Sequence, residues 1–100
     1  MENHATVTLK WLVGEGFPFP KDRQFSCTGF LADEGDQEMI SVIVKIPKEQ
    51  DIESASEAQL FALVDEMSHK LPSEGELFML TSGMKAVAEC RGVTAPSRND

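Results

Sequence analysis

Apolar residues recur at every second position in two segments of the chain, although Leu12 interrupts the polar face of the first. Residues 5–13 place large apolar side chains at every second position, and residues 40–46 do the same with β-branched side chains. A period of two is typical of a strand that buries one face, and β-branched residues favour strands. The buried faces predicted in this way are Val7, Leu9, Trp11 and Val13 in the first segment, and Ile40, Val42, Val44 and Ile46 in the second.

A third strand is predicted between them, over residues 24–32. Its alternation is weaker, with Phe25 and Cys27 on one face, and Gly29 indicates a bulge or a close approach of another backbone. The loop that follows, 33–38, reads DEGDQE, and its central Gly35 can adopt the left-handed conformation that short hairpin loops use. The two flanking strands are therefore expected to pair antiparallel.

A helix is predicted over residues 54–71. Leu60, Leu63, Val64 and Met67 recur at helical spacing, and two overlapping capping boxes mark the start, Ser54 with Glu57 and Ser56 with Gln59. Pro72 favours an end at the preceding residue. We expect this amphipathic helix to pack on one face of the sheet.

The last part of the pattern has two interpretations. Residues 75–81 predict a strand, and 82–92 is either the second arm of a hairpin that turns at Ser82-Gly83, or a second helix capped by Ser82. The serine-glycine turn favours the hairpin. The fold class predicted is α+β: an antiparallel sheet of four to five strands with one helix on one face, in the order β-β-β-α-β-β. Residues 1–95 form one domain and 96–100 a disordered tail.

Composition agrees with one globular domain and indicates its compartment. The chain has 100 residues, 41% of them hydrophobic. None of its apolar stretches approaches the roughly 18 residues that span a bilayer, and Glu2 stands where a signal peptide carries positive charge. We expect a cytoplasmic protein, in which Cys27 and Cys90 are reduced, buried side chains.

The negative charge is concentrated in the middle of the chain. Residues 33–76 hold twelve acids and three bases, a net charge of −9, whereas the remainder has five acids and six bases, a net of +1. Such a field repels phosphate backbones and attracts basic surfaces. A basic protein partner is therefore favoured over direct nucleic-acid or membrane binding.

Motifs that carry chemistry are missing from the sequence. It has no glycine-rich phosphate loop, no paired-cysteine motif and no nucleophile elbow. A thiol dyad would have to combine Cys27 or Cys90 with His4 or His69, and no motif supports this. Asp33, Asp36 and Glu38 could offer oxygen ligands to calcium, but their spacing differs from that of an EF-hand loop. We therefore predict no catalytic residue, no cofactor and no metal site.

The segment 16–25, GFPFPKDRQF, joins the first two predicted strands. Its prolines cannot donate to a ladder and hold the chain extended. Phe17 and Phe19 either plug the open end of the core or form an exposed apolar prong beside Lys21 and Arg23.

Taken together, these patterns predict a non-enzymatic acidic interaction module. It would act as an inhibitor or regulator of a protein partner, in the manner of a phage-type antagonist or an immunity-type protein, with a surface that can imitate nucleic acid. The alternatives are a subunit that self-assembles, for example as a homodimer, through a sheet edge, and a small enzyme or ligand-binding domain with its site on the open sheet face. The residues predicted to bind the partner are Asp33, Glu34, Asp36, Glu38, Phe17, Phe19, Lys21 and Arg23.

Overall fold

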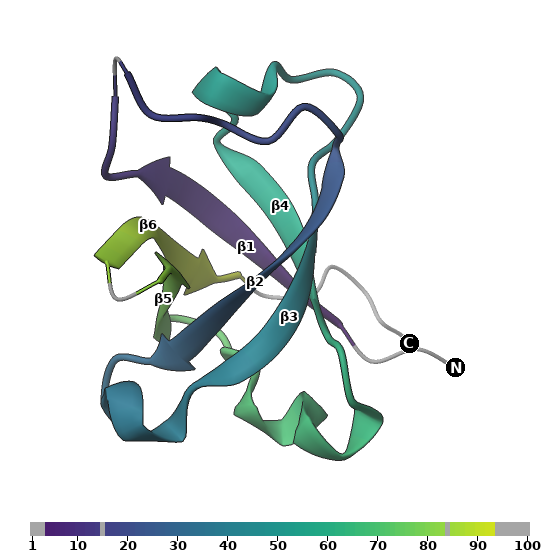
Figure 1. Ribbon diagram of the computed structural model, residues 1–100. Coiled ribbons are helices and arrows are strands. Elements are labelled where there is room, and N and C mark those ends of the chain that lie inside the picture. Colours follow the sequence, from purple (N-terminus) through teal and green to yellow (C-terminus); the bar gives the residue numbers. More distant parts are fainter. Residues whose placement is uncertain (1–3, 15, 84, 94–100) are drawn as a thin grey trace, which may run out of the picture.

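The computed structural model is a closed barrel of six antiparallel strands (Figure 1). It describes residues 4–14, 16–83 and 85–93, so the tail predicted at 96–100 lies outside the described residues. The strands are β1 His4–Trp11, β2 Gln24–Leu31, β3 Ile40–Lys45, β4 Glu57–Ala62, β5 Leu77–Ser82 and β6 Lys85–Gly92. Short 3-10 turns form η1 Asp36–Glu38, η2 Ile52–Ser54 and η3 Asp65–Lys70.

The strands follow one another around the barrel in the order β1-β4-β3-β2-β5-β6, and β6 pairs with β1 to close it. Each strand therefore has an antiparallel partner on both sides. Closure removes the row of unpaired backbone groups that an open sheet presents at its edges.

The core is the inside of the barrel, and the strand alternation explains it. Val7, Val42 and Val44 are completely buried, and Leu9, Ile40 and Ile46 are nearly so. The inward faces predicted for residues 5–13 and 40–46 are confirmed in β1 and β3, although Trp11 and Val13 lie at the rim and are half-buried. The hairpin predicted around Gly35 is also confirmed, because β2 pairs antiparallel with β3 and Gly35 has a φ of 81°.

The prediction of a helix over 54–71 is wrong. The first part of this segment forms β4, which lies between β1 and β3, and Ala58 and Leu60 are buried while Glu57 and Gln59 are exposed. The backbone N–H groups of Ser56 and Glu57 donate to Gln50 Oε1 at 2.7 and 3.2 Å, so neither capping box forms.

The reason for this error is that β4 completes the sheet. It pairs with a neighbour on each side, and a helix in its place would leave the facing backbone groups of β1 and β3 unpaired. The second part of the segment, 65–70, is the 3-10 turn η3 rather than an α-helix. Among the described residues no helix is long and apolar enough to cross a membrane.

The α+β class is therefore overturned, and the described part of the chain is an all-β barrel without a packed helix. The predicted architecture had one helix on one face of an open sheet and left the other face uncovered. The barrel has no such uncovered face, because the sheet is closed on itself. The preference for a hairpin over 82–92 is confirmed, because β5 and β6 pair antiparallel. Ser82 pairs with Lys85 and therefore belongs to β5 rather than to the predicted Ser82-Gly83 turn, and the register shifts between Leu80 and Thr81.

Candidate functional site

Loops connect the strands at two opposite ends of the barrel (Figure 1), and the two ends differ in the residues that they carry. The crossing end consists of the loops 12–23 and 46–56, and includes η2. The acidic end consists of the loops 32–39 and 63–76, and includes η1 and η3. Strand β2, of eight residues, runs from the first end to the second and so separates them by about 25 Å.

The residues predicted to bind a partner fall at opposite ends of the barrel. Phe17, Phe19, Lys21 and Arg23 lie at the crossing end, and Asp33, Glu34, Asp36 and Glu38 at the acidic end. One compact contact patch does not hold both groups.

At the crossing end, aromatic rings cover the mouth of the barrel. The Trp11 ring centroid lies 5.0 Å from that of Phe19, 6.2 Å from Phe17 and 6.5 Å from Phe25. Phe17 and Phe19 contact each other edge to face at 4.9 Å. All four side chains are half-buried, and the rings of Trp11, Phe17 and Phe25 pack on the core. The arrangement is that of a plug over the open end.

Two side chains of this end hold the loop 46–56 in place. Trp11 Nε1 donates to the carbonyl oxygen of Ile52 at 2.8 Å, which ties η2 to β1. Arg23 Nη1 donates to the carbonyl oxygen of Pro47 at 2.6 Å and also to that of Gln50. The guanidinium group of Arg23 is thus used within the fold, a role that no pattern in the sequence indicated, while Lys21 is exposed.

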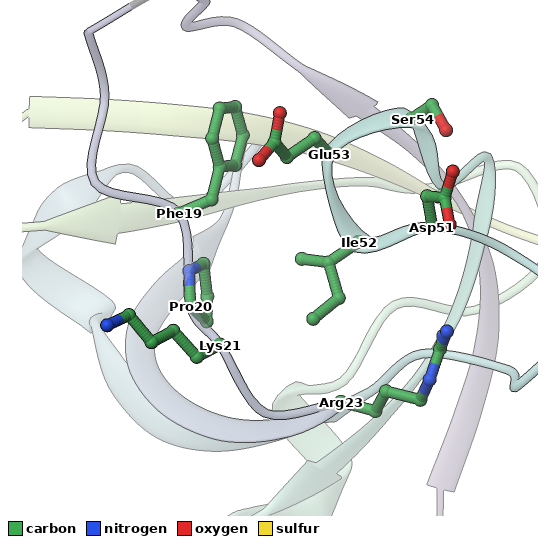
Figure 2. Close-up of a pocket in the computed structure, with 8 residues that line it drawn as sticks. All are labelled: Phe19, Pro20, Lys21, Arg23, Asp51, Ile52, Glu53 and Ser54. Carbon is green, nitrogen blue, oxygen red and sulfur yellow. The ribbon is translucent and has the colours of Figure 1, made fainter.

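A hollow of about 940 Å³ lies between the segment 19–23 and η2 (Figure 2). The side chain of Ile52 points into its middle, and Lys21 points outward from its rim. Asp51 and Glu53 stand on the side of η2, across from Lys21 and Arg23. The hollow is thus lined by apolar side chains together with side chains of both charges.

The acidic end gathers carboxylates from two loops that are far apart in the sequence. Eight acids stand in 32–39 and 63–76, against one lysine, Lys70. Lys70 Nζ lies 3.0 Å from Glu34 Oε1 and 3.1 Å from Glu38 Oε1, and these hydrogen bonds raise the pKa of Lys70. Lys70 therefore joins η3 to the hairpin loop that contains η1, and its positive charge neutralises part of the negative charge of that loop.

The same end carries the two most exposed large apolar side chains of the described residues. Leu63 is 55% exposed and Val64 is 51% exposed, in the link between β4 and η3. In the sequence, both fall on the stripe that the predicted helix would bury. Their spacing from Leu60 and Met67 fits such a stripe, so no pattern in the sequence marked them as exposed.

The candidate nucleophiles are not assembled into a dyad. Both cysteines are free thiols, Cys90 buried and Cys27 half-buried, and burial raises the pKa of Cys27 to about 11 and that of Cys90 further still. His4 stacks on Phe61 at 5.2 Å, and His69 is exposed in η3. Within the described residues, no group of three or more His, Cys, Asp or Glu side chains is arranged to hold a metal ion.

Comparison of the chain with protein-family models, with curated proteins and with solved structures gave no match. The function is therefore inferred from the surface of the barrel itself.

Proposed function

We propose that this chain is a non-enzymatic interaction module that binds a protein partner with a basic surface and so inhibits or regulates that partner. The observation that carries the proposal is the acidic end, whose two loops hold eight acidic residues and one lysine. A surface of one sign raises the rate of encounter with a partner of the opposite sign.

The carboxylates of this end are accessible from solvent, which supports the proposal. Apart from Asp36, whose side chain is not described, all of them are exposed, and of those only Glu34 and Glu38 form ion pairs among the described residues. The unpaired charges add to a negative field that extends about 8 Å into solvent at physiological ionic strength. Such a field also resembles that of a nucleic acid toward a basic groove, which supports the version of the proposal in which the target is a nucleic-acid-binding protein.

The fold gives less support to the two alternatives. A subunit that assembles through a strand edge needs an unpaired edge, and each strand of the barrel is paired on both sides. A ligand-binding domain with its site on an open sheet face needs such a face, and the barrel turns the apolar face of its strands inward.

The test is capture of the partner from a lysate of the host with two charge-reversed variants. One variant carries Asp33→Lys, Asp65→Lys and Glu66→Lys, which reverse unpaired charges of the acidic end and leave the glutamates on Lys70 intact. The control carries Glu49→Lys, Asp51→Lys and Glu53→Lys in the loop 46–56 of the other end. We expect the control to keep the partner, the first variant to lose it, and high salt to release it.

Both variants should have a free energy of unfolding within about 0.5 kcal/mol of the wild type, since the substituted side chains are exposed. Retention of the partner by the first variant, or binding that is insensitive to salt, would contradict the proposal.

A further inference from the structure

Leu63 and Val64 form an exposed apolar pair directly before two acidic residues. They lie next to each other at the end of β4, exposed by 55% and 51%, and the acids Asp65 and Glu66 follow directly. Exposed apolar side chains are common singly, but an adjacent apolar pair beside charged residues resembles an interface anchor with a polar rim.

The pair is held in a defined position by the backbone. The N–H of Leu63 donates to the carbonyl oxygen of Ser41 at 3.0 Å, and the carbonyl oxygen of Val64 accepts from the N–H of Met67 at 2.8 Å. The link between β4 and η3 is thereby fixed to β3 on one side and to η3 on the other. A segment that is ordered before binding loses less conformational entropy when a partner covers it.

The charges around the pair select among the possible occupants. A second copy of the chain would bring two acidic ends together, and like charges placed face to face oppose association. A nucleic acid or an anionic lipid surface would be repelled for the same reason. A protein surface with an apolar depression ringed by lysine or arginine satisfies both the apolar pair and its acidic rim.

We infer that Leu63 and Val64 are the apolar anchor through which the acidic end docks on its basic partner. This inference rests on the proposed function and adds to it the contact that distinguishes the partner from other basic proteins. Attraction by charge alone is sequence-independent, whereas the burial of two apolar side chains requires a matching depression.

The experiment uses the whole chain, immobilised and screened against a random peptide library. The variant is Leu63→Ser with Val64→Ser, and the matched control is Leu12→Ser, which removes an apolar side chain that is 42% exposed at the crossing end. We expect enriched peptides that combine lysine or arginine with large apolar residues. The Kd of these peptides should rise at least about tenfold for the double variant and stay unchanged for the control. The reason is that Leu63 and Val64 are about half exposed in the free chain, and serine in their place buries less apolar surface when a peptide binds.

The remaining outcomes overturn the inference, and they separate it from the proposed function. Basic peptides that bind in a salt-sensitive manner and equally well to the double variant would overturn the anchor and leave the proposed function standing. Enriched peptides without basic residues, or no enrichment, would overturn both. Self-association of the wild-type chain in sedimentation, abolished in the double variant, would assign the pair to a second copy and overturn the anchor as well.

Discussion

Gly29 is the position at which the smallest substitution should damage the barrel most clearly. It is buried in β2, and a Cβ atom built on it would overlap with Phe78 Cε2 and would lie 2.7 Å from the carbonyl oxygen of Met79. Of the two interpretations that the sequence left open for this glycine, a bulge or a close backbone approach, the structure shows the close approach. Its φ lies outside the left-handed region, so Gly29→Ala tests the steric contact alone.

The magnitude follows from what would have to move. Phe78 is completely buried, so its ring can leave the contact only by displacing core neighbours. The carbonyl oxygen of Met79 belongs to β5, which pairs with β2 at this place, so the second contact can be relieved only by shifting the ladder. Overpacking costs about 1–3 kcal/mol, and the involvement of backbone places this case at the upper end, about 3 kcal/mol.

The assay is unfolding by urea and by heat, with Gly14→Ala as the matched control. A Cβ atom built on Gly14 would meet no heavy atom within 4 Å outside its chain neighbours, and this glycine lacks a positive φ, so its substitution should be neutral or slightly stabilising. For Gly29→Ala we expect the free energy of unfolding to fall by about 3 kcal/mol, or the Tm to fall by roughly 12–24 °C.

A second substitution checks the mechanism. Phe78→Leu removes the ring atoms that the new methyl group meets, but not the Met79 carbonyl oxygen, so the Gly29→Ala/Phe78→Leu double variant should be more stable than the sum of the two single changes predicts. If Gly29→Ala unfolds within about 1 kcal/mol of the wild type, or if the two changes are strictly additive, the steric reasoning is refuted.

Three further predictions concern side chains that connect the loops or lie buried in the barrel wall. Trp11→Phe removes the hydrogen bond to the Ile52 carbonyl oxygen, and should lower the free energy of unfolding in urea by about 1–2 kcal/mol; no change would mean that the bond is not formed in solution. Lys70→Met should lower the Tm at low salt and pH 7, and the gap to the wild type should close in high salt, where exposed pairs are screened. Because the pKa of Lys70 is raised in the folded chain, its ion pairs stabilise the folded state fully below pH 10.5, and the difference in Tm should shrink as the pH rises above that value. A difference in Tm that is independent of pH and salt would contradict the ion pairs. Burial raises the pKa of Cys27 to about 11, so iodoacetamide at pH 8 should alkylate it far more slowly in the native chain than in urea, and stability should fall as the pH rises from about 9 toward 11; equal alkylation rates would disprove the burial of this thiol.

The local pattern of apolar, polar and turn residues determined much of the barrel without reference to tertiary contacts. The period of two in β1 and β3, the hairpin around Gly35 and the hairpin of β5 with β6 all follow from neighbouring residues, because side-chain alternation and turn conformations are properties of short segments. The plug formed by Phe17 and Phe19 was one of two interpretations that the sequence left open, since burial of a loop aromatic depends on what the fold places beside it.

Other features were decided only by contacts between distant segments. Ala58 and Leu60 are compatible with a strand and with a helix, and β4 is a strand because β1 and β3 offer unpaired backbone groups on both of its sides. That pairing left Leu63 and Val64 on the surface and brought 63–76 beside 32–39, where Lys70 joins the two loops. The sequence by itself determined how many charges the chain carries and which strands alternate. Closure of the barrel, a non-local event, determined that eight of the acidic residues share one end and that Leu63 and Val64 are exposed at that same end.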